Sequence, residues 1–464
     1  MSSAETIYAL ATPPGKSGVA VLRLSGPRAL AALKSLSSLQ AVTPRHAYVV
    51  TFRHPQTQEV IDKGLALYFP APRSFTGEDV VECHMHGSLA VISEMLAGVS
   101  AIEGLRSAEP GEFTRRAFIQ GKMDLIEAEG LADLIEAETS RQKSQALRQM
   151  QGNLSGFYER LRSGIIGALA HLEAYIDFPD EEIPESVLAA LDKDIEALQV
   201  DIQAALQDRQ RGERLRDGIS VVILGAPNAG KSSLLNLVAR REVAIVSHKA
   251  GTTRDAIEIH LDIHGFPVIM VDTAGLRDSD EDIEVEGIRR ALARAQSADI
   301  KLVLFDGAGW PHRDSASLAL CDAQTLTIVT KSDLIASNPA GHETAAPDSH
   351  PDGQYPAQSL CASQDNILFI SVKTGEGMDR LLAALEERVI GFFSGESAPL
   401  ITRARHRALL LDALKYLNKS LAPLPLELKC EELRQATQAV GKITGKIQVD
   451  DVLDVIFRSF CIGK

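Results

Sequence analysis

The sequence lacks the features that mark secreted, zinc-stapled or membrane-spanning proteins. Its 464 residues include five cysteines, and none of these forms a Cys-x-x-Cys pair. A zinc ribbon would need such pairs, and five cysteines in a chain of this length argue against a disulfide framework, so the cysteine pattern predicts a reducing compartment, the cytoplasm. The longest apolar runs fall short of the roughly 20 residues that cross a bilayer. The opening MSSAETIYAL also lacks the basic and apolar segments of a signal peptide.

Positive charge is also in short supply. The chain carries 48 Lys and Arg residues against 62 Asp and Glu residues, a formal net charge of -14. This balance disfavours non-specific attraction to nucleic acid, although a local basic patch on one domain remains compatible with it. Apolar residues at 45% and charged residues at 24% are typical of a globular protein. The length predicts about three domains.

The sequence pattern changes along the chain in a way that predicts an inserted domain. Residues 1–120 alternate β-type and helical runs. Residues 121–216 and 378–464 carry apolar side chains at helical spacing, whereas residues 217–377 alternate strands with helices. We therefore expect an α/β domain inserted into a discontinuous helical domain. Within the inserted domain, residues 337–365 are rich in Pro, Ser, Ala and Gly, which favours a surface insertion.

A phosphate-binding loop is the clearest motif. The segment GAPNAGKSS, residues 225–233, matches G-x-x-x-x-G-K-[ST] and stands between an apolar β-type run and a helix pattern. The glycines let backbone N–H groups point at phosphates, and Lys231 is expected to reach the β and γ oxygens. The Ser232 hydroxyl is expected to coordinate Mg²⁺.

Four further motifs follow in the order of a guanine-nucleotide domain. AGTTRD supplies Thr253, a second expected Mg²⁺ ligand when the third phosphate is present. VDTAG supplies Asp272, expected to support Mg²⁺ through water, and Gly275, whose N–H would sense the γ-phosphate. TKSD supplies Asp333, whose carboxylate can accept two hydrogen bonds that guanine offers and adenine does not.

The fourth motif is the segment SVK, residues 371–373, which would cover the base. In the TKSD motif, Thr330 stands where the usual NKxD motif has asparagine, and we expect this difference to loosen base selectivity slightly. The predicted GTP-binding residues are Asn228, Ala229, Gly230, Lys231, Ser232, Ser233, Ser247, His248, Lys249, Ala250, Gly251, Thr252, Thr253, Asp272, Thr273, Ala274, Gly275, Thr330, Lys331, Asp333, Ser371, Val372 and Lys373.

One side chain that is expected of a GTP-hydrolysing switch protein is missing. In many of these proteins a glutamine follows DTAG and orients the attacking water. Here the next residue is Leu276, which has no polar group. Either the chain binds nucleotide and hydrolyses it poorly, or another residue or an ion replaces the glutamine.

The chain resembles the tRNA-modification GTPases of the MnmE (TrmE) family nearly from end to end. The resemblance rests on GAPNAGKSS, AIVSHKAGTTRD, DTAGLRDSDEDIEVEGI, IDFPDEE, PGEFTRRAFIQGKMDLIEAE and the final CIGK. Ala226 departs from the family, which usually has arginine there, at a position peripheral to the phosphates. The resemblance implies a multidomain α/β protein. Its parts would be an α+β folate-binding-like and dimerisation domain, an all-helical domain and an inserted Ras-like P-loop GTPase domain.

The resemblance also implies a homodimer that works with an FAD-dependent partner subunit. Together they would install a (carboxymethyl)aminomethyl group at C5 of the wobble uridine of certain tRNAs. The bridging carbon would come from a tetrahydrofolate derivative, either 5,10-methylene or 5-formyl. A GTP-dependent binding switch of the ribosome-assembly type, without modification chemistry, remains the alternative, and folate binding separates the two.

In this family a monovalent cation, preferably K⁺, and a distant glutamate stand in for the missing glutamine. By position the glutamate is Glu284, which would orient the attacking water. On sequence alone it is one of a run of acids, so a solvated surface carboxylate remains the alternative. The cation-binding loop would be ordered only when two GTPase domains meet, so hydrolysis would require dimerisation. The implied K⁺ ligands are Asn228, Ser247, Lys249 and Thr252.

A tetrahydrofolate site in the first domain is implied by the same resemblance. Glu82 would accept paired hydrogen bonds from the pterin, and Arg23 and Lys122 would meet the folate's carboxylates or its one-carbon substituent. Lys464 is a fourth implied folate position, reached from the other subunit. Cys461 is implied as a second catalytic residue that assists the modification, with a buried structural thiol as the alternative.

Overall fold

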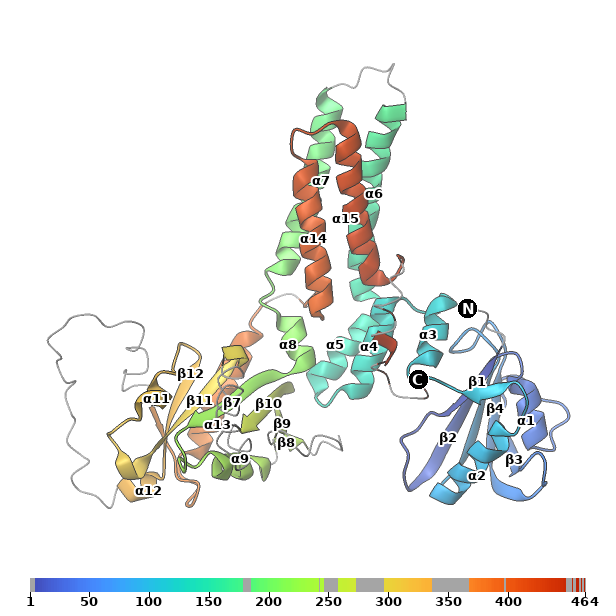
Figure 1. The fold of residues 1–464 in the computed structure, drawn as a ribbon, viewed down its shortest axis with the longest axis horizontal. Helices are drawn as coiled ribbons and strands as arrows, with labels where there is room; N and C mark the ends of the chain where they lie inside the picture. Colours follow the sequence, from blue (N-terminus) through green and yellow to red (C-terminus); the bar gives the residue numbers. More distant parts are fainter. Residues whose placement is uncertain are drawn as a thin grey trace, which may run out of the picture. The chain divides into compact units, whose positions relative to one another are not determined.

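The computed structural model divides the chain into two compact units (Figure 1), and each is described by itself. The first unit comprises Met1–Ala132, Leu147–Gln199 and Leu409–Lys464, and the second comprises Asp133–Ala146 and Val200–Ala408. The residues that the structure describes are 5–177, 185–241, 243–245, 258–272, 296–335, 367–395, 398–447, 453, 456–458, 460 and 463.

A six-stranded sheet forms the amino-terminal part of the first unit. Its strand order is β3-β4-β5-β2-β1-β6, and neighbouring strands are antiparallel except for the parallel pair β1 and β6. The strands are β1 (Thr6–Leu10), β2 (Ser17–Ser25), β3 (Tyr48–Arg53), β4 (Val60–Phe69), β5 (Val80–Gly87) and β6 (Leu105–Ser107).

One face of this sheet is covered by α1 (Ala29–Leu36) and α2 (Leu89–Ser100). The alternation along β2 explains the packing, because Leu22 and Leu24 are buried in the core shared with these helices. Residues between them, such as Arg23, lie on the opposite face. On that side α3 (Glu112–Ile119) packs Phe113 against β1.

Helices that precede and helices that follow the α/β segment in the sequence pack together in the first unit. They are α6 (Asn153–Asp177), α7 (Glu185–Leu206), α14 (Ala404–Ser420) and α15 (Leu426–Thr444), which run side by side (Figure 1). Arg434 of α15 contacts Glu173 of α6 at 2.7 Å, and Gln199 of α7 donates to Asn418 of α14 at 3.0 Å. The α/β segment between α7 and α14 is therefore an insertion, as the sequence predicts. The shorter helices α4 (Leu125–Glu136) and α5 (Ser140–Met150) precede this bundle.

A seven-stranded sheet forms the second unit, in the order β13-β12-β11-β7-β10-β9-β8. The five strands from β13 to β10 are parallel, and β9 and β8 add antiparallel pairs at one edge. The strands are β7 (Ile219–Gly225), β8 (Ala244–Ile245), β9 (Glu258–Ile263), β10 (Phe266–Asp272), β11 (Ile300–Asp306), β12 (Thr325–Thr330) and β13 (Ile367–Phe369).

Apolar side chains lie on both faces of this sheet, as expected of parallel strands that helices cover on each side. Helix α9 packs with the larger of the two clusters. The helical segments of the unit are α8 (Arg211–Asp217), α9 (Lys231–Ala239), α11 (Ser315–Leu318), α12 (Ser332–Ile335), α13 (Met378–Phe392) and the 3-10 turn η2 (Gly307–Gly309). Among the described residues, every helix is too short or too polar to cross a bilayer.

Helix α13 belongs by its packing to the α/β unit. The sequence assigned residues 378–464 to the helical domain, but Leu381, Leu385 and Val389 are fully buried in the core beside the seven-stranded sheet. The physical reason is an apolar face at helical spacing that this sheet covers. The other boundaries of the three predicted domains stay predictions.

Candidate functional site

The predicted phosphate loop joins β7 to α9, in the strand, loop and helix arrangement that the motif requires. Gly225 has φ 145, and a Cβ there would lie 2.5 Å from the carbonyl oxygen of Leu304, so only glycine fits. Asn228 and Gly230 also have positive φ, and Gly230 is the residue that precedes α9. The first amides of α9 therefore lie beside the loop, where a phosphate would receive N–H groups and the helix dipole.

Two predicted nucleotide contacts already hold polar partners around this loop. Lys231 is 8% exposed, and its Nζ donates to the carbonyl oxygens of Gly225 and Ala226 at 2.9 and 2.8 Å. The Ser232 hydroxyl donates to Asp272 Oδ2 at 2.6 Å. A hydroxyl and a carboxylate in contact are oxygen donors of the kind that Mg²⁺ prefers, so these residues fit the ion.

The opposite side of the loop is held by Thr330 at the end of β12. Its hydroxyl donates to the Ala229 carbonyl at 2.7 Å, and the Phe305 carbonyl lies 3.2 Å away. Next to it, Lys331 Nζ lies 2.5 Å from Asp306 Oδ2. Burial would raise the pKa of Asp306, but the Lys331 ammonium and the Ala308 amide outweigh burial and hold that pKa below its usual value.

The predicted base-reading carboxylate lies where β12 and β13 end side by side. Asp333 Oδ1 accepts the Ser371 hydroxyl at 2.7 Å. The Ser371 oxygen also accepts the Thr374 amide at 3.2 Å, and the Ser371 amide donates to the Glu376 carbonyl at 3.0 Å. The turn that contains Ser371, Val372 and Lys373 is therefore fixed against Asp333, and this contact sets the orientation of the carboxylate.

On the first unit, the structure brings two of the implied folate residues into contact. Arg23 and Glu82 are register partners on β2 and β5, and Arg23 Nη2 lies 2.9 Å from Glu82 Oε1. Both side chains are 20% exposed. The Arg23 guanidinium carbon lies 5.3 Å from the centre of the Phe75 ring and 5.9 Å from that of Phe113. An accessible carboxylate beside aromatic rings fits a flat heterocycle that carries N–H donors.

Of the two other implied folate residues, the structure describes Lys122. Lys122 Nζ donates to the Pro72 carbonyl at 3.0 Å, in the loop between β4 and β5. Lys464 itself lies outside the described residues, but its neighbour Gly463 is described. A Cβ at Gly463 would lie 2.1 Å from the Leu10 carbonyl, so Gly463 lies against β1.

Comparison with known proteins identifies the family. Two family models match the chain: "GTP-binding protein TrmE N-terminus" over residues 6–122 and "MnmE helical domain" over residues 125–461. The "tRNA modification GTPase MnmE" of Parvibaculum lavamentivorans is 51% identical over 99% of this chain and 100% of its own length. The chain belongs to the MnmE family of tRNA modification GTPases.

Other relatives in the MnmE family match over the same span. The "tRNA modification GTPase MnmE" of Paramagnetospirillum magneticum is 49% identical over 99% of this chain and 100% of its own length. The "5-taurinomethyluridine-[tRNA] synthase subunit GTPB3, mitochondrial" of Danio rerio is 42% identical over 99% of this chain and 93% of that protein. The predicted fold class is thereby confirmed: an amino-terminal α+β domain, a helical domain and an inserted Ras-like GTPase domain.

Several predicted positions of this MnmE-family chain lie outside the described residues, and their roles stay predictions. They include the implied catalytic residues, most of the implied K⁺ ligands and the second Mg²⁺ ligand. The positions are Ser247, His248, Lys249, Ala250, Gly251, Thr252, Thr253, Thr273, Ala274, Gly275, Glu284, Cys461 and Lys464.

Sequence reasoning missed two residues that shape the base-reading side. Asp306, at the end of β11, holds Lys331. Gly307 follows it, and a Cβ there would lie 2.4 Å from the Thr330 carbonyl and 2.8 Å from the Lys331 carbonyl. The stretch FDGAG at the end of an apolar run was an available signal, since a polar residue and a glycine after a parallel strand mark the functional edge of such a sheet.

Proposed function

We propose that the chain is a K⁺-dependent GTPase that dimerisation activates, and that it acts with an FAD-dependent partner subunit on tRNA in the cytoplasm. The pair installs a (carboxymethyl)aminomethyl group at C5 of the wobble uridine, and a tetrahydrofolate derivative is the source of the bridging carbon. The observation that carries the nucleotide part is the contact of Ser232 with Asp272 beside the phosphate loop. The names of the relatives, which include a subunit of a [tRNA] synthase, support the tRNA part.

In the nucleotide site, the chain's own groups bind and orient GTP. The amides at the start of α9 and the Lys231 ammonium receive the phosphates, and Lys231 leaves the loop carbonyls of Gly225 and Ala226 to do so. Ser232 and Thr253 hold Mg²⁺, which neutralises phosphate charge when bound. Asp333, oriented by Ser371, accepts the N–H groups of guanine.

The hydrolytic step is assigned to Glu284 and to a bound cation. Glu284 orients the attacking water in place of the missing glutamine. K⁺, when bound, supplies positive charge where other GTPases use an arginine. Asn228, which has a positive φ within the loop, offers a side-chain oxygen for this ion. Ser247, Lys249 and Thr252 offer backbone oxygens. Pairing of two GTPase domains in a homodimer completes this site.

In the folate site, Glu82 receives the pterin N–H groups, and Arg23 and Lys122 meet the carboxylates or the one-carbon group. Lys464 adds a further contact from the other subunit, and Cys461 assists the modification. The support for this assignment is the Arg23–Glu82 pair beside the rings of Phe75 and Phe113.

The test combines nucleoside analysis with kinetics. In a strain that lacks the gene, tRNA should lose its C5 modification at wobble uridines, and the wild-type gene should restore it. Unchanged modification would favour a GTP-dependent binding switch instead. Purified protein should hydrolyse GTP faster in K⁺ than in Na⁺, and Glu284→Ala should bind GTP normally while hydrolysing it roughly 100-fold more slowly or worse. Equal rates in the two salts would refute the cation role.

A further inference from the structure

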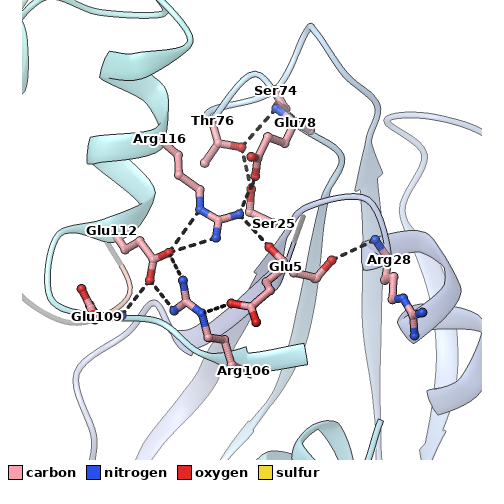
Figure 2. A network of polar contacts seen from close by, with 11 residues as sticks. Glu5, Ser25, Arg28, Ser74, Thr76, Glu78, Arg106, Glu109, Glu112 and Arg116 are labelled. Atoms are coloured by element: carbon pink, nitrogen blue, oxygen red, sulfur yellow. Dashed lines mark hydrogen bonds and ion pairs between the residues drawn. The ribbon is translucent and has the colours of Figure 1, made fainter. Parts of the chain in front are cut away.

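A chain of largely buried charged side chains joins α3 to the loop before β5 in the first unit (Figure 2). Arg116 on α3 contacts Glu112 Oε1 at 2.9 Å through Nη2, and Glu78 Oε2 at 3.0 Å through Nη1. The exposed fractions of the three side chains are 11%, 12% and 10%. At this depth an arginine that bonds two carboxylates fixes the elements that carry them, because leaving either charge unpaired is costly.

The loop side of this network is also tied to β2. Glu78 Oε2 accepts the Ser25 hydroxyl at 2.8 Å, and Ser25 Oγ lies 2.7 Å from Thr76 Oγ1. Ser25 and Thr76 are fully buried. The loop of residues 74–78 is thus held from two directions, by β2 below it and by α3 through Arg116 (Figure 2).

The two elements that Arg116 joins each carry an aromatic ring that lies beside Arg23 of the candidate folate site. The loop carries Phe75 and α3 carries Phe113, and both rings lie within 6 Å of the Arg23 guanidinium carbon, at 5.3 and 5.9 Å. Arg23 in turn bonds Glu82 at 2.9 Å. The loop also faces Lys122, because a Cβ at Gly77 would lie 3.3 Å from its Cδ. Any shift between loop and helix would therefore reach Arg23 and Lys122 together.

We propose that Arg116 is a positioning residue for the folate site. By bonding both Glu78 and Glu112, it holds Phe75 and Phe113 beside Arg23, and so fixes the Arg23–Glu82 pair for a reduced pterin. The proposal rests on the proposed folate binding. It assigns Arg116 no contact with the ligand, so its effect is one of preorganisation.

The neighbouring Arg106 provides a matched control within the same network. In the described part of the chain, Arg106 bonds Glu112 at 2.6 and 2.8 Å, Glu5 at 2.7 Å and the carbonyl of Ser107. It therefore braces α3 and shares the Glu112 carboxylate, while its bonds do not include the loop of residues 74–78. Arg106→Met and Arg116→Met each remove one arginine from one network, and only the second removes the tie to the loop.

The experiment measures binding of 5-formyl-tetrahydrofolate to the full-length protein by titration calorimetry, together with the thermal midpoint. We expect Arg116→Met to raise the Kd by about tenfold, as for a lost preorganising contact, and Arg106→Met to change it by less than about twofold. Both variants should lower the thermal midpoint. A wild-type Kd for Arg116→Met would overturn the proposal, and so would an equal loss of affinity in both variants, which would reduce the network to a purely stabilising role.

A conservative variant keeps the test decisive if Arg116→Met folds poorly. Lysine keeps the positive charge and replaces the planar, forked guanidinium with a compact ammonium group, so Arg116→Lys should raise the Kd by an intermediate factor. If Arg116→Met does not fold and Arg116→Lys binds 5-formyl-tetrahydrofolate with wild-type affinity, the positioning role of Arg116 is refuted. Failure of the underlying function has a different signature: wild-type protein that does not bind the probe refutes folate binding itself. Binding that Arg23→Ala abolishes and Arg116→Met leaves intact refutes only the positioning role.

Discussion

Replacing Thr330 with valine tests whether the phosphate loop is tied to the base-reading end of β12. The Thr330 residue is 1% exposed, and its hydroxyl donates to the Ala229 carbonyl at 2.7 Å. Valine has nearly the same shape and lacks the hydroxyl, so the substitution removes the hydrogen bond with little change in volume. It leaves the Ala229 carbonyl without this donor at a buried position, where water is a poor replacement.

The magnitude follows from this geometry. A typical neutral hydrogen bond contributes about 1 kcal/mol net, and a buried carbonyl left unpaired costs about 1–3 kcal/mol. We therefore expect Thr330→Val to lower the free energy of unfolding of the second unit by about 2 kcal/mol. Ala229 belongs to the loop that is proposed to receive the phosphates. The free energy of GDP binding should therefore become less favourable by about 1 kcal/mol, which is roughly a fivefold increase in the Kd for GDP.

The assay pairs a fluorescent-GDP titration with urea unfolding. Thr327→Val is the matched control, since Thr327 lies on the same strand, is 5% exposed, and points to the opposite face of the sheet. The control should lose stability and keep its affinity for GDP. If Thr330→Val lost stability and bound GDP as tightly as the wild type, the hydroxyl would serve the sheet alone and the reasoning would be refuted.

Two further predictions concern Gly307 in the second unit and Glu112 in the first. Gly307→Ala should weaken GDP binding about tenfold or more, because its Cβ would lie 2.4 Å from the Thr330 carbonyl, whereas Gly309→Ala, with open space around it, should bind normally in the same titration. For Glu112, burial raises the pKa, but Arg106, the Glu109 amide and Arg116 outweigh it and keep the pKa below its ordinary value of 4.5. A depressed folded-state pKa stabilises the protein above the unfolded-state pKa and loses that contribution as the pH falls through the folded-state pKa. Wild-type stability in urea should thus fall more steeply with acid below about pH 4.5 than that of Glu112→Gln, and parallel curves would contradict this.

Local motifs were predictable from the sequence, because neighbouring residues build them. The strand, loop and helix around Lys231 depend on glycines and an apolar run within about ten residues. The pairing of Asp306 with Lys331 could not be predicted, because it depends on residues that are distant in the sequence. It requires β11 and β12 to lie side by side in a register that places Asp306 opposite Thr330. Nothing local fixes that register, since apolar strands of a parallel sheet resemble one another.

Thr330 shows how a substitution can be placed correctly and interpreted too narrowly. From the sequence, it is a departure from an asparagine and predicts looser base selectivity. In the structure, its hydroxyl also contacts the carbonyl of Ala229, a residue 101 positions earlier in the chain, and the looser selectivity stays a prediction. That role depends on tertiary contact between β12 and the loop, so it could not be derived from the TKSD motif alone.

The segment PGEFTRRAF carried the family resemblance without revealing its chemistry, and the structure shows why so many of its positions are constrained. A Cβ at Gly111 would lie 2.3 Å from the Phe457 carbonyl, so the absence of a side chain at Gly111 lets the backbone of Phe457 approach closely. Glu112 and Arg116, one helical turn apart, form the ion pair that reaches Glu78. Phe113 lies between them in sequence and borders Arg23. The motif is therefore a junction at which three separate parts of the first unit meet, and the effect of changing Glu112, Phe113 or Arg116 should appear at the candidate folate site as well as in stability.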